Sequence, residues 1–452
     1  MSSSPAISSG SSSIDNTTVP PSPSPTTGSD RFGSSNDSND VCWILTSAFL
    51  IFTMQTGYAL LESGVVSRKN EANILVKNAV NIMFGSLAFW LFGYGLSFGT
   101  PANQLVGYGD FMVTASELDM GPKYSEMAFQ LAYSTTSTAI ISGSMSERCK
   151  FVSYLLFSSV NTFIYCVPAR WLLREGGWLR SMGAVDIGGS GTVHLVGGCS
   201  SIVAAILLGP RIGRFGANSS GDIPMGNPTN CLMGLFMLWW GWLGFSAGST
   251  FGITGDKWKF SSRASVTTIL ASMGGGSVGM VLSYWLKHGL QDITMLMDSI
   301  LGSLVAISGG APIFRPGFSV LVGSVAAFLV LSVSPVMARL RIDDPTNSFA
   351  VHAVGGAWGL IAIGLFAEKD NLINYTNGTN GLLINWDTRL IASQLLAIAA
   401  LSTWSILSTL AILLAIKYTV GLRMSVRDEI LGPDFVDHGL ELSATGSHKL
   451  FG

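Results

Sequence analysis

Long apolar runs separated by short polar stretches begin at Val41 and continue almost to the end of the chain. A helix needs about 20 mostly apolar residues to cross a bilayer, and most of these runs reach that length. Their hydropathy predicts about eleven membrane-spanning helices, of which the eighth is the weakest. The expected spans are roughly 41–62, 73–98, 126–144, 151–170, 192–210, 228–252, 265–285, 292–310, 316–337, 348–367 and 389–417. The sequence therefore predicts an all-α membrane protein.

The first 40 residues have a different composition, rich in Ser, Pro, Thr, Asn and Gly. Such a segment cannot bury enough apolar surface to fold alone. It also lacks the basic start and apolar centre of a signal peptide. We therefore expect a disordered extracellular tail at 1–40, a membrane domain at 41–417 and a cytoplasmic tail at 418–452.

The overall composition agrees with a membrane protein, since 48% of the residues are hydrophobic and only 12% are charged. Soluble proteins carry about 25% charged residues. The net charge of −2 argues against a nucleic-acid partner. The five cysteines form neither a metal motif nor a disulfide framework, so we expect no metal and no cofactor. We find no nucleophile–base constellation and no nucleotide-binding loop, so an enzyme or an ATP-driven pump is not expected.

Basic residues gather in the loops after odd-numbered spans and predict the orientation. These loops carry Arg68, Lys69, Arg148, Lys150, Arg211, Arg214, Lys287, Arg339 and Arg341. By the positive-inside rule they face the cytoplasm, although the loops after the fourth and sixth spans are also basic. We expect a plasma-membrane protein with its N-terminus outside. Asn-X-Ser/Thr sequons make Asn16, Asn36, Asn374 and Asn377 the glycosylation candidates, all on the expected outer side.

A short phrase occurs twice inside the apolar runs. Residues 193–198 read V-H-L-V-G-G and residues 351–356 read V-H-A-V-G-G. Each copy holds a histidine, and an ionisable residue within a span usually has a function. The copies fall on the fifth and tenth expected spans, so the two halves run in opposite directions. This predicts a five-plus-five inverted repeat with one extra last helix, and a transport path between the repeats.

Several further motifs carry a family resemblance from about Val41 to about Gly439. The markers are M-Q-T-G-Y-A-L-L-E-S-G at 54–64, R-K-N at 68–70, F-Q at 129–130, S-E-R at 146–148, G-A-V-D at 183–186, G-W-L-G-F-S-A-G-S at 241–249, D-D-P at 343–345, G-L-R-M-S at 421–425 and D-H-G at 437–439. With these motifs in this order, the chain resembles the family of ammonium transporters, methylammonium permeases and Rhesus-type proteins. It resembles the ammonium transporter branch most. The resemblance implies an eleven-helix bundle, a homotrimer and one conduction path per subunit.

A path for ammonium must avoid moving the bare ion through hydrocarbon, which costs tens of kcal/mol. One solution holds the cation at an outer mouth, removes a proton and passes neutral ammonia. Such a mouth needs aromatic faces and a hydroxyl acceptor. Phe245 and Ser249 share one helix face, and both match the family's outer recognition site. Tyr133 stands where the family usually has a gating Phe, and Trp242 is expected to help line the path. Ordinary helix packing is the alternative for these aromatics.

The family's paired pore histidines match His194 and His352. A neutral imidazole offers one donor and one acceptor, and it can carry a proton. The alternative is a pair of interior histidines with satisfied hydrogen bonds. Asp186, eight residues before His194, either supports the binding site or caps the following helix, and it could do both. Asp343 and Asp344 are expected chiefly to cap and anchor their loop.

The chain departs from the family pattern at three places. Leu173 stands where many members have an outer Trp, which should weaken cation capture. Asn347 replaces a usual Asp five residues before His352, which puts an acidic role there in doubt. Val436 occupies a tail position that is Ser or Thr in many members, so phosphorylation is not expected there.

The favoured function is transmembrane transport of ammonium, with methylammonium as a further candidate substrate. Two alternatives stay open: an electroneutral Rhesus-like ammonia channel, and an ammonium sensor that signals through its tail. A membrane enzyme or a seven-span receptor is disfavoured by the span count and by the paired histidine phrases. The resemblance also implies that the first part of the tail docks on the inner face of a neighbouring subunit.

Overall fold

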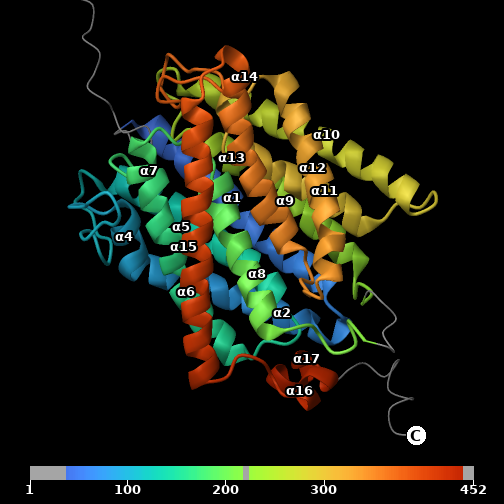
Figure 1. Cartoon of the computed structure of the whole chain (residues 1–452). Coiled ribbons are helices and arrows are strands. Elements are labelled where there is room, and N and C mark those ends of the chain that lie inside the picture. The colour runs from blue at the N-terminus through green and yellow to red at the C-terminus, as the bar shows by residue number, and fades with distance from the viewer. Residues whose placement is uncertain (1–36, 217–222, 441–452) are drawn as a thin grey trace, which may run out of the picture.

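The structure is a computed structural model that describes residues 37–216 and 223–440. Eleven long helical segments run through this part of the chain (Figure 1). Eight are single helices: α1 (Ser38–Val65), α5 (Met120–Met145), α6 (Phe151–Leu172), α9 (Pro228–Gly248), α10 (Lys257–Leu286), α11 (Ile293–Ser308), α12 (Pro316–Arg339) and α15 (Arg389–Thr419). The predicted number of spans is therefore confirmed. The eighth, α11, was the weakest prediction and has only 16 residues.

Three spans are interrupted by π-helical or 3₁₀ turns. The second comprises η1 (Arg68–Asn70), α2 (Glu71–Val80), η2 (Asn81–Gly85), α3 (Ser86–Ala88), η3 (Phe89–Gly93) and α4 (Tyr94–Phe98). The fifth and tenth each begin with a π-helical turn: η4 (Ser190–Leu195) leads into α8 (Val196–Leu208), and η6 (Phe349–Val354) leads into α13 (Gly355–Phe366). The hydropathy pattern did not predict these turns. Short helices complete the described part: α7 (Trp178–Ser181), η5 (Ala311–Ile313), α14 (Leu382–Asn385), α16 (Val426–Leu431) and α17 (Pro433–His438).

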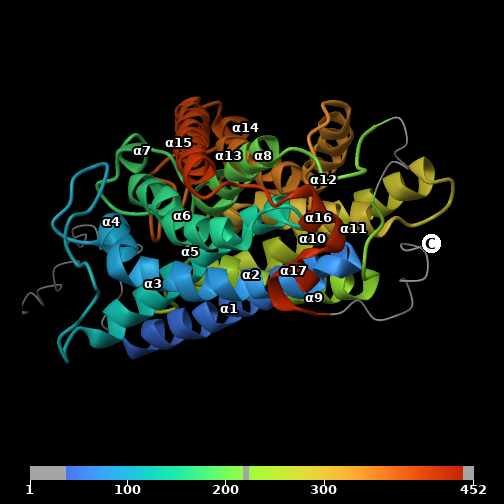
Figure 2. The same cartoon turned by 90° about the horizontal axis from the view of Figure 1, so that it is seen from below.

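The helices form one bundle whose described ends lie at opposite poles. In Figure 1, α7 and α14 lie at the top, whereas α16 and α17 lie across the bottom. The view from below in Figure 2 shows α1 and α9 on one side of the bundle and α15 on the other. The start of α1 is fixed at the upper pole, where the Asp40 carboxylate accepts hydrogen bonds from the Ile253 and Thr254 amides. An odd number of spans produces this arrangement.

The two repeated phrases meet back to back at the centre of the bundle. The second glycine of each copy packs against the residue that follows the histidine of the other copy. A Cβ atom on Gly198 would lie 2.2 Å from the Ala353 nitrogen, and one on Gly356 would lie 2.9 Å from the Leu195 nitrogen. The contacts thus repeat in both directions, as an inverted repeat requires. Small residues permit this close approach of two helix backbones.

Some boundaries differ from the prediction for physical reasons. We expected the sixth span to reach residue 252, but α9 ends at Gly248. Phe251 and Gly252 have φ values of +51° and +133°, which no α-helix accommodates. We expected the seventh span to begin at 265, but α10 begins at Lys257. Its first two turns are polar, so hydropathy did not include them. Hydropathy locates the apolar part of a helix and not its polar ends.

Candidate functional site

The two repeated histidines lie in contact at the centre of the bundle. Their Nδ1 atoms are 3.2 Å apart, and their rings stack with centroids 5.2 Å apart. Both side chains are buried, with 0% of His194 and 5% of His352 exposed. Among the described residues, the Nε2 atom of His194 has no hydrogen-bond partner. Because a buried polar atom without a partner is costly, this nitrogen is a natural binding point for a small polar molecule.

The contact between the two Nδ1 atoms determines what the pair offers. One ring must donate a proton from Nδ1 and the other must accept it. The donating ring then has an acceptor at Nε2, and the accepting ring carries its own proton at Nε2. The neutral pair therefore presents one donor and one acceptor, which suits a ligand such as ammonia that can both donate and accept.

Three aromatic rings lie in a column on one side of the histidines. Trp242 stacks on His194 with centroids 5.1 Å apart, and Phe245 lies 5.4 Å from the same ring. Phe245 also stacks on Tyr133 at 4.3 Å, with the ring planes 17° apart. All three aromatic side chains are at most 1% exposed. The structure thus brings the predicted aromatic residues together in one column that ends on His194.

Ser249 lies at the far end of this column, where α9 stops. Its Oγ atom donates to the Phe245 carbonyl at 2.5 Å and is hydrogen-bonded to the Tyr133 hydroxyl. The Tyr133 hydroxyl also lies 3.2 Å from the Phe245 carbonyl. The hydroxyl predicted to receive a cation is therefore engaged by a tyrosine. The stacked rings close the column at this level.

Trp242 does more than fill space between helices. Its Nε1 atom donates to the Ser308 hydroxyl at 2.7 Å, at the end of α11. That bond and the stacking on His194 fix the indole ring in this column. Sequence reasoning did not find Ser308, because a lone serine at a helix end carries no distinctive signal.

Asp186 caps the turn that holds His194. Its Oδ2 atom accepts hydrogen bonds from the Gly191 and Thr192 amides at 3.0 and 2.8 Å and from the Thr192 hydroxyl at 3.1 Å. Asp344 does the same in the second repeat, because its Oδ2 atom accepts from the Phe349 amide at 2.8 Å. Burial raises the pKa of Asp344 to about 6. The geometry favours the capping interpretation of both aspartates.

A small cavity opens on the other side of the histidines. It is lined by Tyr58, Leu61, Glu62, Ile140, Leu238, Leu301, Thr346, Ser348, Val351 and His352. The Tyr58 ring lies 6.2 Å from the His352 ring. Glu62 is a buried carboxyl in this wall, with 2% of its surface exposed. Sequence reasoning quoted Tyr58 and Glu62 within a family marker but gave them no role, and it passed over Thr346 and Ser348.

Comparisons with known proteins agree with this geometry. The family model described as "Ammonium Transporter Family" matches residues 42–442. The chain belongs to the ammonium transporter family. A relative in Caenorhabditis elegans named "Putative ammonium transporter 3" is 39% identical over 416 residues, which cover 89% of this chain and 60% of that protein. A second, "Putative ammonium transporter 2" from the same organism, is also 39% identical, over 89% of this chain and 81% of the relative.

A solved structure entitled "Sensor Amt Protein" has a TM-score of 0.81 at 27% identity, covering 89% of this chain and 98% of that chain. The predicted membrane fold and family are therefore confirmed. Both relatives are named as transporters, which agrees with the expectation that the chain is not an enzyme. The chain spans about 60% of the length of the first of these relatives.

Two departures from the pattern of the transporter family have structural counterparts. Leu173 is buried, with 1% exposed, in the apolar cluster that also contains Tyr133 and Phe245, so a leucine fits this position. Asn347 donates a hydrogen bond of 2.7 Å to Asp298 on α11. A buried carboxyl therefore does stand beside the loop before His352, although it comes from another helix.

The tail docks on one pole of its own bundle. The Glu429 carboxylate accepts hydrogen bonds from the Ile212 amide at 2.8 Å and from Arg423 at 2.8–3.0 Å. Asp434 caps α2 by accepting from the Ala72 and Asn73 amides at 3.1 and 2.7 Å. All these contacts lie within one chain, and docking on a neighbouring subunit remains a prediction.

A buried ion-pair cluster connects three loops at the same pole. Arg211 pairs with Glu147 and, at 2.8 Å, with Asp343. Burial alone would raise the pKa of Asp343, but hydrogen bonds and charge from Arg211 hold it below its ordinary value. The same carboxylates raise the pKa of Arg211 despite burial. The expected anchoring role of Asp343 agrees with these contacts.

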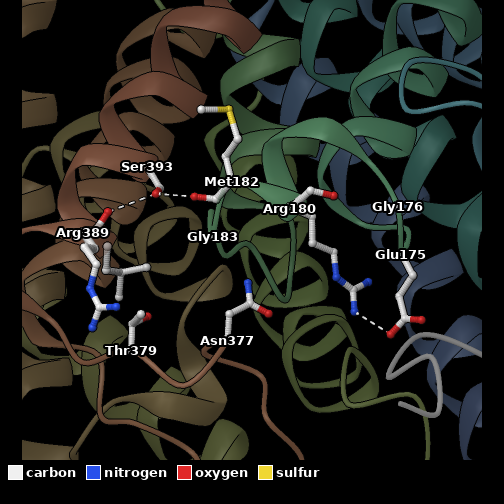
Figure 3. A pocket seen from close by; sticks show the side chains of 11 residues that line it. Glu175, Gly176, Arg180, Met182, Gly183, Asn377, Thr379, Arg389 and Ser393 are labelled. Carbon is white, nitrogen blue, oxygen red and sulfur yellow. Dashed lines mark hydrogen bonds and ion pairs between the residues drawn. The ribbon is translucent and has the colours of Figure 1, made fainter. Parts of the chain in front are cut away.

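The glycosylation candidates lie at the opposite pole or outside the described residues. Asn374 is exposed, whereas Asn377 is half-buried and lines, with Arg180, Arg389 and Ser393, the surface pocket of Figure 3. Asn16 and Asn36 lie outside the described residues. The described sequons and the docked tail are thus at opposite poles, as the predicted orientation requires. Glycosylation itself remains a prediction.

Proposed function

We propose that this protein transports ammonium across the plasma membrane through the column of aromatic rings and histidines. The observation that carries the proposal is the histidine pair, with an unpartnered His194 Nε2, between an aromatic column and a cavity. The rings of Phe245 and Tyr133 would hold NH₄⁺ at the outer end through cation–π contacts, and Ser249 would supply the hydroxyl acceptor. Trp242 would orient His194, and Asp186 would position the turn that carries it.

In this mechanism the cation loses a proton before it enters the apolar part of the path. Moving neutral NH₃ past the rings avoids the cost of a bare ion in a low-dielectric medium. The donor and acceptor at the two Nε2 atoms replace the water that ammonia leaves behind. The proton crosses separately if transport moves charge, and stays behind if the protein is an electroneutral ammonia channel.

The wider assignments belong to the same proposal. We infer a membrane domain at 41–417 that assembles as a homotrimer with one path per subunit. Large apolar side chains such as Phe49, Phe236, Trp240 and Trp285 are exposed on the sides of the bundle, where lipid or a neighbouring subunit would cover them. The tail-bearing pole faces the cytoplasm and the segment 1–40 lies outside. Methylammonium is a second candidate substrate.

The test is an ammonium jump on proteoliposomes, with current and luminal pH recorded together. Wild-type protein should give a saturating current that falls to background in the double variant His194→Ala/His352→Ala. His288→Asn, in an exposed loop, is the matched control and should keep the wild-type current. A fast luminal pH change without current would assign the electroneutral mechanism. If a folded trimer gave neither a current nor a pH change, transport would be refuted.

Ammonium sensing is a second candidate, because the tail is tied to the pole that contains the cavity. Glu429 and Asp434 link it to the loop after α8 and to the start of α2. The solved structure entitled "Sensor Amt Protein" has the same fold. A tail that changes its protease sensitivity when ammonium is added, in the absence of transport, would support this function.

A further inference from the structure

Glu62 is a carboxyl in the wall of the cavity below the histidine pair. It lies on α1, one helical turn after Tyr58, whose ring faces His352 at 6.2 Å. Ionisable groups are rare within membrane spans and usually have a function. The mechanism described above does not use this carboxyl.

The hydrogen bonds around Glu62 suit both its protonated and its ionised form. Ser142 Oγ lies 2.5 and 2.6 Å from the two carboxyl oxygens and 2.8 Å from the Ala139 carbonyl. One hydroxyl proton cannot serve both directions at once. When Glu62 is ionised, Ser142 donates to it. When Glu62 is protonated, it donates to Ser142, which then donates to Ala139.

A second donor and a nearby cation support the ionised form. Asn78 Nδ2 donates to a Glu62 oxygen at 2.7 Å. Lys77 on α2 interacts electrostatically with Glu62, and its ammonium group donates to the Cys149 carbonyl at 3.1 Å. The remaining ionisable groups around the carboxyl are Tyr58 on the same helix, Tyr154 on α6 and His352 on η6. Both charge states are therefore accommodated without moving the backbone.

We propose that Glu62 is the proton-exchange site at the inner end of the path, and this inference rests on the proposed ammonium transport. Ammonia that passes His352 takes the proton of the Glu62 carboxyl and leaves as NH₄⁺. The carboxylate regains a proton from water at the tail-bearing pole. The net step is NH₃ plus a solvent proton giving NH₄⁺, and it runs in reverse for efflux.

The test uses full-length protein in proteoliposomes, with the pH of each compartment varied in turn. In Glu62→Gln the amide keeps the shape and the contact with Ser142 but cannot exchange a proton. We expect the ammonium-driven current to fall at least about tenfold, since a positioned acid–base group contributes about 100-fold or more. We also expect the current to lose its dependence on pH at the tail-bearing side. Glu62→Asp should restore part of both.

Glu126→Gln is the matched control, because it makes the same substitution at a buried glutamate of α5 that does not line the cavity. It should keep the wild-type current and pH dependence. If Glu62→Gln proves unstable, Ser142→Ala decides. The bond from this hydroxyl to the ionised carboxylate is the stronger of its two arrangements, so its loss should move the pH profile upward.

A wild-type current with an unchanged pH profile in Glu62→Gln would overturn the inference. An unchanged profile in Ser142→Ala would do the same. The histidine double variant reports separately on transport, so the proposed function survives if only the Glu62 result is negative.

Discussion

The hydroxyl of Ser249 is already engaged before any cation reaches it. Its oxygen donates to the Phe245 carbonyl, and the Tyr133 hydroxyl is bonded to the same oxygen. This oxygen has two lone pairs, and an ammonium ion competes with the tyrosine for the one that accepts from the phenol. A neutral hydrogen bond contributes about 0.5–1.5 kcal/mol, so the tyrosine can lower the affinity measurably.

Tyr133→Phe removes this competing hydroxyl and keeps the ring that stacks on Phe245. We expect the KM for ammonium to fall about two- to tenfold, because 0.5–1.5 kcal/mol corresponds to that range. Concentration-dependent currents in proteoliposomes measure it. Ser249→Ala in the same background should abolish the gain. A KM that rises in Tyr133→Phe would mean that the phenol oxygen itself binds the cation.

Single residues also show what could and could not be predicted from the sequence. The histidines stand out as ionisable residues within apolar runs, whereas Phe245 and Ser249 were predicted from their match to the family pattern. Glu62 was equally visible as a charge in a span, but its relation to the cavity depends on the packing of α1 against α5 and η6. Asp298 compensates for Asn347 from another helix, and no pattern along the chain connects them.

At the level of elements, the fifth and tenth spans place the two histidines in register. The number and direction of the spans could be predicted from hydropathy and from the repeated phrase. The π-helical turns η4 and η6 could not, because residues in a π-turn show the same apolar pattern as an α-helix. These turns sit where each span begins and carry the histidines, which agrees with the frequent occurrence of π-turns at functional sites.

Within the second repeated phrase, Gly356 lies closest to the backbone of the other repeat. A Cβ atom there would lie 2.4 Å from the Ser190 carbonyl oxygen, so Gly356→Ala must push η4 and α13 apart. We expect a cost of about 1–3 kcal/mol in stability and a strongly reduced current, because the histidine contact depends on this spacing.

Thermal unfolding in detergent and proteoliposome currents measure the two effects of Gly356→Ala. Gly317→Ala, at the start of α12, is the control, because a Cβ atom there meets nothing within 4 Å. If Gly356→Ala behaved like this control, the close packing of the repeats would not determine the geometry of the path.

At the scale of the whole molecule, the tail joins separate parts of the bundle. The loops after α1, α5 and α8 meet the tail at one pole. The backbone also takes part, because the Met424 amide donates to the Arg148 carbonyl at 3.0 Å. The tail therefore connects spans that are distant in sequence, which the charged composition of residues 418–440 could not predict.

Glu429 is the central contact of this connection, because it is only 5% exposed and accepts from both Ile212 and Arg423. Glu429→Gln weakens a hydrogen-bonded ion pair, and hydrogen bonds to charged groups contribute about 1.5–3 kcal/mol. We expect faster proteolysis of the tail and a lower unfolding temperature of the protein. Asp428→Asn removes the same charge one residue earlier, where the structure shows no side-chain hydrogen bond, and should change neither.

Equal effects of the two substitutions would mean that net charge, and not this contact, holds the tail. A change of current in Glu429→Gln alone would couple the tail to the path.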